Sequence, residues 1–275
     1  MKLTYIFHSG FVLETEQSIL VFDYWLDPSG VMEGVLQSNM PLYVFSSHFH
    51  EDHFTREIFE WKRQKPNITY ILSKDILRHR RANKEDADVW LAKGGSWSDG
   101  RISVKALGST DSGVSWIVET EDKLIFHAGD LNNWYARFLS DAVPGQTIYS
   151  EEFEEDIDPI AHEKQYLGEL KDIRKVSDSF DLVMFPIDGR IPPRISKATM
   201  SREWKNGPAI TASLRKRTVL TRPSLTKPGM KAVTMAVEPS TRLSPRNGST
   251  SPTTNSLNVS SPLPLRNIMD SPLMT

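Results

Sequence analysis

The sequence contains no cysteine, which excludes disulfide bonds and thiolate metal ligands. Any metal ion would therefore be held by nitrogen and oxygen donors. No apolar run approaches the ~20 residues that a membrane-spanning helix needs. His8 interrupts the N-terminal apolar stretch before the core of a secretory signal could form. We expect a soluble, cytoplasmic protein with no membrane partner.

Positive charge is scarce in one part of the chain and negative charge in the other. Residues 1–190 hold 20 Lys/Arg against 32 Asp/Glu, whereas residues 191–275 hold 13 against 3, although the net charge of the 275 residues is only −2. An acidic surface repels nucleic-acid phosphates. We therefore predict two unlike parts, and we expect no nucleic-acid partner for the first of them.

Histidine is absent from residues 191–275, and the aromatic residues there are reduced to Trp204. Serine and threonine account for 23 of these 85 residues and proline for 11, and no strand or amphipathic helix stands out. Low hydrophobicity with high net charge is typical of disorder. We predict an irregular tail, which is either a flexible basic arm or an out-of-frame translation of the C-terminal region.

Residues 1–190 repeat one pattern, a short apolar run that ends in a polar residue. Such runs are typical of strands covered on both faces, and their ends deliver side chains to one edge of a sheet. The predicted strands are 18–22, 42–45, 68–72, 114–118, 123–126 and 182–187, with Glu121-Asp122 as a hairpin turn. Helical patterns cover 55–64, 74–83 and 160–176. Alternating strands and helices predict a layered α/β domain.

The strongest motif is His48-Phe49-His50-Glu51-Asp52-His53, directly after a predicted buried strand. In an extended segment, His48 and His50 point to the same side and can reach one metal ion. Asp52 and His53 can turn toward a second ion. Imidazole and carboxylate donors suit zinc, iron, manganese or nickel, and the pattern alone does not choose among them.

A second motif, His127-Ala128-Gly129-Asp130, follows another predicted strand. His127 would complete a three-histidine set with His48 and His50. Asp130 is spaced to bridge two metal ions, and Gly129 permits a tight turn there. On its own this motif is typical of a strand-end turn, but together with the first motif it predicts a metal centre.

Five further residues are weaker candidates. Asp23 and Asp111 are placed either to accept a hydrogen bond from a metal-bound imidazole or to serve in polar turns, and Asp111 is also a candidate for substrate binding. Trp134 would line a substrate pocket or pack in the core. Arg190 would bind an anionic group of the substrate. We interpret His8 as a structural histidine.

The first motif, followed later in the chain by the second, resembles the metallo-β-lactamase-fold superfamily of metal-dependent hydrolases. The resemblance covers residues 2–190. Within the superfamily, the start His8-Ser9-Gly10-Phe11 is similar to the bacterial branch near ascorbate-6-phosphate lactonase-like proteins. The resemblance implies a four-layer αββα sandwich, with the metal ions at one edge of its sheets.

The resemblance also implies the chemistry. One divalent ion would be held by His48, His50 and His127, and a second by Asp52, His53 and a bridging Asp130. Zinc is the preferred metal, with manganese or iron as alternatives. A metal-bound hydroxide would attack an ester, lactone or phosphoester bond of a small molecule, with Asp52 and Asp130 as the catalytic carboxylates.

One ligand of the family pattern is missing. Family members supply a further histidine for the second ion after a late strand, and no histidine follows His162 in this chain. We therefore expect a C-terminally incomplete fold and a weak second metal site. Two alternatives stay open: a catalytically impaired, truncated member that binds metal weakly, and a hydrolase domain with a basic, partner-binding tail. The sequence specifies no oligomeric state.

Overall fold

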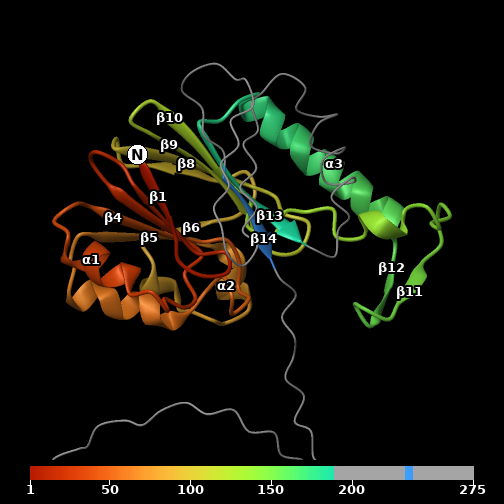
Figure 1. The fold of residues 1–275 in the computed structure, drawn as a ribbon, viewed down its shortest axis with the longest axis horizontal. Coiled ribbons are helices and arrows are strands. Elements are labelled where there is room, and N and C mark those ends of the chain that lie inside the picture. Colours follow the sequence, from red (N-terminus) through yellow and green to blue (C-terminus); the bar gives the residue numbers. More distant parts are fainter. Residues whose placement is uncertain (189–232, 238–275) are drawn as a thin grey trace, which may run out of the picture. The chain divides into compact units, whose positions relative to one another are not determined.

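The structure of the chain, a computed structural model, describes residues 1–188 and 233–237 (Figure 1). Every described residue belongs to one compact unit, Met1–Pro239. Arg190 and most of the predicted tail lie outside the described residues, and so does the hypothesis of an out-of-frame origin.

Six strands form the first sheet, in the order β1-β2-β3-β4-β5-β6. They are β1 (Lys2–Tyr5), β2 (Phe11–Glu14), β3 (Ile19–Phe22), β4 (Leu42–Ser46), β5 (Ile68–Ser73) and β6 (Val89–Leu91). The first three strands are antiparallel, and β3 to β6 are parallel. The predicted strands at 18–22, 42–45 and 68–72 are confirmed.

Six further strands form the second sheet, in the order β14-β13-β10-β9-β8-β7. They are β7 (Ser96–Ser98), β8 (Ile102–Leu107), β9 (Ser115–Thr120), β10 (Lys123–His127), β13 (Leu182–Asp188) and β14 (Val233–Val237). The predicted hairpin of β9 and β10 is confirmed. Its turn residues Glu121 and Asp122 have φ values of 51° and 57°, the left-handed geometry that matches the twist of paired strands.

The side chains of β3 show how the two sheets pack. Leu20 and Phe22 lie in a core that also contains Trp116 and Ile125 of the second sheet. Val21 points to the opposite face, toward the helices. Because successive side chains alternate between the faces of a strand, a continuous apolar run such as β3 fills both layers of core.

Helices cover the outer face of each sheet. On the first sheet lie α1 (Val31–Gln37), the 3-10 helix Arg56–Arg63 and α2 (Lys74–Arg78), and on the second lies α3 (Pro159–Val176) (Figure 1). The remaining described elements are 3-10 helices at Lys84–Asp86 and Ala136–Phe138 and a small sheet of β11 (Ile148–Ser150) and β12 (Glu155–Ile157). The predicted four-layer αββα sandwich is confirmed. Among the described helices, none is long and apolar enough to cross a bilayer.

Two predicted helices differ in detail from those observed. The segment expected at 55–64 is a 3-10 helix, and its two buried side chains, Ile58 and Trp61, are spaced by three residues as that helix requires. The helix expected at 74–83 ends at Arg78. Its end is explained by Arg80, whose φ of 55° a right-handed helix cannot accommodate.

The prediction that no strand stands out in residues 191–275 is wrong at β14. This strand pairs in parallel with β13, with Met184 opposite Val233 and Asp188 opposite Val237. A five-residue run is too short to stand out in a segment rich in serine, threonine and proline. This segment forms a strand because the edge of β13 has backbone N–H and C=O groups that pair with it.

Candidate metal centre

The ends of three strands bring the motif residues to one edge of the two sheets. Asp23 follows β3, and its backbone N–H donates to the carbonyl of Phe45 at 2.9 Å, so it lies beside the end of β4. Ser47 and the first motif follow β4 directly. In the second sheet His127 is the last residue of β10. The predicted convergence of polar strand ends is therefore present.

Asp23 is fully buried and organises the first motif. Its Oδ1 accepts from the backbone N–H of Ser47 at 2.7 Å. Its Oδ2 accepts from the Ser47 hydroxyl at 2.7 Å and lies 2.8 Å from Nδ1 of His53. A carboxylate that accepts several hydrogen bonds in a buried site holds the donors in one orientation. The sequence-based role of Asp23, accepting from an imidazole, is what this geometry provides.

The hydrogen bonds to Asp23 decide which ring nitrogens carry protons. Because a carboxylate only accepts, Nδ1 of His53 must donate. The single proton of the Ser47 hydroxyl also goes to Asp23, so the Ser47 oxygen accepts from Nδ1 of His48 at 2.9 Å. Both rings are therefore protonated at Nδ1, and the Nε2 atom of each is turned toward the opposite carboxylates.

The carboxylate of Asp130 lies close to both of these Nε2 atoms. Its Oδ1 lies 3.2 Å from Nε2 of His53, and its Oδ2 lies 3.6 Å from Nε2 of His48. Nε2 of His48 is buried and has no hydrogen-bond partner among the described residues. The lone pair of this Nε2 atom of His48 and the carboxylate of Asp130 repel each other unless a cation lies between them. The donor set therefore fits divalent metal ions.

The ligand atoms fall into two clusters, in each of which all atoms lie within 4.8 Å of one another. The first cluster is His48, His50, Asp111 and Asp130, and the second is His8, Asp52 and His53. The residues of the first motif are divided between these clusters, with His48 and His50 in the first and Asp52 and His53 in the second. Asp130 touches both sites, because its Oδ1 faces His53 of the second cluster.

Charge in the centre favours a cation. Burial, together with nearby His53, lowers the pKa of His48 to about 4, so this imidazole is neutral and free to bind a metal at neutral pH. Burial also lowers the pKa of His53, but Asp130 and Asp23 outweigh it and raise that pKa well above the usual value. Burial raises the pKa of Asp130, but His53 and His48 outweigh it and hold that pKa far below the usual value. The Asp130 carboxylate therefore stays ionised.

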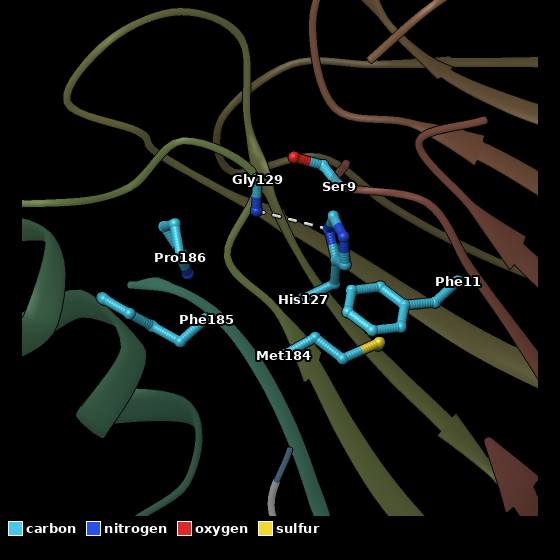
Figure 2. Close-up of a pocket in the computed structure, with 7 residues that line it drawn as sticks. All are labelled: Ser9, Phe11, His127, Gly129, Met184, Phe185 and Pro186. Carbon is cyan, nitrogen blue, oxygen red and sulfur yellow. Dashed lines mark hydrogen bonds between the residues drawn. The ribbon is translucent and has the colours of Figure 1, made fainter. Parts of the chain in front are cut away.

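His127 lies beside the clusters and in neither of them. Its Nδ1 accepts from the backbone N–H of Gly129 at 3.3 Å, its Nε2 lies 3.8 Å from Oδ2 of Asp23, and its ring stacks on Phe22 at 5.0 Å. Figure 2 shows the ring beside Phe11 and Met184. These residues line a small cavity of about 10 Å³, which has room for about one water molecule. His127 lies two residues after Ile125 on β10, so both side chains point to the inner face of the sheet, which explains this position.

Three other residues have specific positions near the site. His8, interpreted from sequence as structural, places Nδ1 3.5 Å from Oδ2 of Asp52 and so joins the second cluster. The Trp134 indole N–H donates to the backbone carbonyl of Asp130 at 3.1 Å, which makes Trp134 a support of the Asp130 turn. Nε2 of His162 lies 3.3 Å from the Trp134 backbone nitrogen, and His162 belongs to neither cluster.

His8 and Asp111 are the cluster members that sequence reasoning did not assign as ligands. His8 lies at the tip of the β1–β2 turn with a φ of 51°, and Asp111 lies in the β8–β9 loop. A single histidine and a single aspartate in loops carry no spacing signal. For Asp111 one signal is available, because it precedes β9, and β9 pairs with β10, the strand that carries the second motif.

Comparison with known proteins extends the fold assignment. No family model and no curated protein matches the sequence. Among solved structures, Igni18, a metallo hydrolase from Ignicoccus hospitalis, is similar with a TM-score of 0.50 and 16% identity over 76% of this chain and 80% of that chain.

Two further solved structures are similar. A possible metal-dependent hydrolase from Veillonella parvula has a TM-score of 0.45 and 12% identity over 76% of this chain and 83% of its own. The metallo-β-lactamase fold protein YhfI from Bacillus subtilis has a TM-score of 0.38 and 12% identity over 66% of this chain and 64% of its own. The nearer assignment to a lactonase-like branch stays a prediction. The two six-stranded sheets between layers of helices, together with this likeness, give the chain the metallo-β-lactamase fold.

Proposed function

We propose that the chain is a metal-dependent hydrolase that cleaves an ester, lactone or phosphoester bond of a small molecule at a centre of two divalent ions. The observation that carries the proposal is the pair of Nε2 atoms of His48 and His53, both directed at Asp130. A buried histidine with a structural role would find a hydrogen-bond partner at this nitrogen, and Nε2 of His48 has none among the described residues.

Each cluster has its own ion in this proposal. His48 and His50 hold the first ion, His8, Asp52 and His53 hold the second, and Asp130 lies between the two. Participation of His8 supplies a third donor to the second site, which lacks the C-terminal histidine of the family pattern. Two divalent ions in such a centre activate water and polarise the scissile bond.

The protein residues position groups and move protons. Asp23 fixes the ring orientation of His53 directly and that of His48 through the Ser47 hydroxyl. Asp52 is suited to proton transfer, because about a third of its side chain (34%) is exposed while its Oδ2 lies 3.7 Å from Nε2 of His53. It takes a proton from the attacking water or passes one to the leaving group.

The open side of the centre supports a substrate that enters from solvent. The side chains of His50 and Asp111 are 40% and 39% exposed, whereas His48 and Asp23 are fully buried. The buried His48 thus lies at the bottom of the site, and the more exposed His50 and Asp111 lie at its rim. This arrangement favours a small molecule that presents an oxygen to the ions over a substrate that must be enclosed.

The test is hydrolysis of p-nitrophenyl acetate, bis(p-nitrophenyl) phosphate and a simple lactone by the full chain, loaded separately with Zn²⁺, Mn²⁺ or Fe²⁺. We expect metal-dependent turnover of one of these bond classes, reduced at least about 100-fold in His48→Ala. Asp52→Asn should lower kcat more than it lowers metal content. The matched control is Asp122→Asn, in an exposed turn, which should change neither.

Two outcomes would count against the proposal. Turnover that persists in His48→Ala or after chelator treatment would place the activity elsewhere. Metal bound with no turnover of any of the three bond classes would instead favour the alternative of a catalytically impaired metal-binding protein.

A further inference from the structure

We propose that Asp111, and not His127, is the direct ligand that completes the metal site of His48 and His50, and that its carboxylate shifts the preference of this site from Zn²⁺ toward Mn²⁺ or Fe²⁺. This inference rests on the metal centre of the proposed function. It concerns which side chain of this chain meets the first ion and which class of metal that choice selects.

Asp111 lies where a third ligand is needed. Its Oδ2 is 3.2 Å from Nδ1 of His50 and 4.0 Å from Nε2 of His48. The same Nε2 of His48 is 3.6 Å from Oδ2 of Asp130. Two nitrogens and two carboxylate oxygens therefore lie within 4.8 Å of one another, close enough to share one ion.

The loop that carries Asp111 is packed against the first motif. The backbone N–H of Val114 donates to the carbonyl of Ser47 at 3.0 Å. Gly113 has a φ of 65°, and a Cβ added there would overlap the carbonyl oxygen of Ser47 and lie 2.6 Å from Cβ of His48. Only glycine permits this approach. The contact fixes the loop two residues from Asp111, so the position of this carboxylate is built into the fold.

A second glycine brings the other carboxylate to the same place. Gly129 has a φ of 53°, and a Cβ added there would lie 2.8 Å from Cβ of Ser47. Asp130 follows immediately. Two loops of the second sheet thus make close contact with Ser47 and His48, one at Gly113 and the other at Gly129. Each loop contributes one aspartate to the first cluster.

Both ring nitrogens of His127 and the face of its ring contact groups other than the first cluster. Its Nδ1 accepts from Gly129, its Nε2 faces Asp23 at 3.8 Å, and its ring stacks on Phe22 (Figure 2). Asp23 in turn holds His53 and, through Ser47, His48. His127 is therefore a positioning residue, which packs against the carboxylate that orients the ligands.

The exchange of an imidazole for a carboxylate changes the chemistry of the site. With Asp111, the first site has two nitrogens and two anionic oxygens, where a three-histidine site with Asp130 would have three nitrogens and one. Carboxylate oxygens suit Mn²⁺, whereas imidazole suits Zn²⁺ and Fe²⁺, and mixed histidine–carboxylate sites are typical of Fe²⁺. Zn²⁺ generally binds such sites more tightly than Mn²⁺ or Fe²⁺, and the carboxylate makes this difference in affinity smaller.

The experiment compares metal binding by full-length variants in the absence of any substrate. Metal-stripped protein is titrated with Mn²⁺, with the free ion followed by electron paramagnetic resonance, and with Zn²⁺ in competition with a chromophoric chelator. The variants are Asp111→Asn, Asp111→His, His127→Gln and His48→Ala. Ser112→Ala, in the same loop, is the matched control.

We expect Asp111→Asn to weaken Mn²⁺ binding at one site at least about tenfold, and Ser112→Ala to leave it unchanged. Asp111→His should raise the ratio of Zn²⁺ to Mn²⁺ affinity at least about tenfold. His127→Gln should change both affinities less than Asp111→Asn does. Circular dichroism of each metal-free variant checks that it is folded. The Asp111 variants are the decisive ones, because this side chain is 39% exposed and its substitution disturbs the core least.

Two results would overturn the inference, and they differ from failure of the proposed function. If Asp111→Asn binds Mn²⁺ like wild type while His48→Ala does not, Asp111 is no ligand and the metal centre stands. If folded His127→Gln loses an ion that Asp111→Asn retains, His127 is the ligand. If His48→Ala binds metal like wild type, the proposed centre itself is wrong.

Discussion

The two sheets contribute to the centre in opposite ways. The first sheet supplies most of the nitrogen donors from one contiguous motif, and the buried carboxylate of Asp23 orients this motif by hydrogen bonds to Ser47 and His53. The second sheet supplies oxygen donors from two separate loops, each brought into place by a glycine. The histidines of the proposed centre are therefore encoded by one local motif, whereas the positions of Asp111 and Asp130 depend on how the second sheet packs against the first.

The largest expected effect comes from removing the support on the first sheet. Asp23→Ala leaves the Ser47 amide, the Ser47 hydroxyl and the His53 ring without their buried acceptor. We expect the free energy of unfolding of the metal-free protein to fall by about 3–5 kcal/mol, and the metal content to fall close to zero. Chemical denaturation and elemental analysis measure the two effects.

A control for this prediction exists far from the centre. Asp99 also accepts three hydrogen bonds, from the Tyr43 hydroxyl and from the amides of Arg101 and Ile102. Asp99→Ala should lower stability and leave metal content unchanged. If Asp23→Ala retained its metal, the idea that the first sheet orients the ligands through this carboxylate would be refuted.

A smaller effect is expected from the loops of the second sheet. Gly113→Ala combines an unfavourable positive φ with a clash against Ser47, for a cost of about 3 kcal/mol. Gly94 has a φ of 85° and open space around it, so Gly94→Ala has the backbone strain alone, about 1 kcal/mol. Denaturation of both variants should reveal the difference, and only Gly113→Ala should lose metal. Equal losses of stability would show that the close approach is not needed.

The smallest effect is expected where the sheets meet away from the centre. In the β9–β10 turn, Glu121 accepts from the backbone amides of Glu16 at 3.1 Å and Gln17 at 2.7 Å. Glu121→Gln should lower the free energy of unfolding by no more than about 1 kcal/mol at pH 7, since the contact is largely solvent-exposed. Metal content should stay at the wild-type level, as in the exposed-turn variant Asp122→Asn.

This last contact also has a pH dependence. Slight burial raises the pKa of Glu121, but the hydrogen bonds from Thr15 and the amides of Glu16 and Gln17 outweigh it and lower that pKa. A carboxyl group with a lowered pKa stabilises the fold above its unfolded-state pKa, and the contribution disappears as the pH falls through the folded-state value. The stability difference between wild type and Glu121→Gln should therefore shrink in acid. A difference that grew with acidity would contradict this assignment.

The same comparison of sheets explains how much the sequence could predict. His48, His50, Asp52 and His53 were predictable because they are contiguous and follow a buried strand. The position of Asp130 at the same edge was predictable from its place three residues after the end of β10. These positions depend on local geometry and on the rule that strands deliver polar residues to one edge.

The parts that the sequence could not predict depend on packing between distant segments. His127 has the spacing of a ligand, yet the strand alternation of β10 directs it at Phe22 between the sheets. Asp111 reaches the first cluster only because Gly113 lets its loop approach Ser47. His8 comes into contact with Asp52 through the turn of β1 and β2, and β14 exists because β13 offers it an edge.

The most direct test of the account is the number of metal ions per chain. Protein purified without chelator and without an affinity-tag histidine run would be measured by elemental analysis, beside His48→Ala. The account predicts about two divalent ions per chain for the wild type and a clear loss in the variant. Wild-type protein that stays folded and binds no divalent ion, even after incubation with Mn²⁺, Fe²⁺ or Zn²⁺, would contradict it.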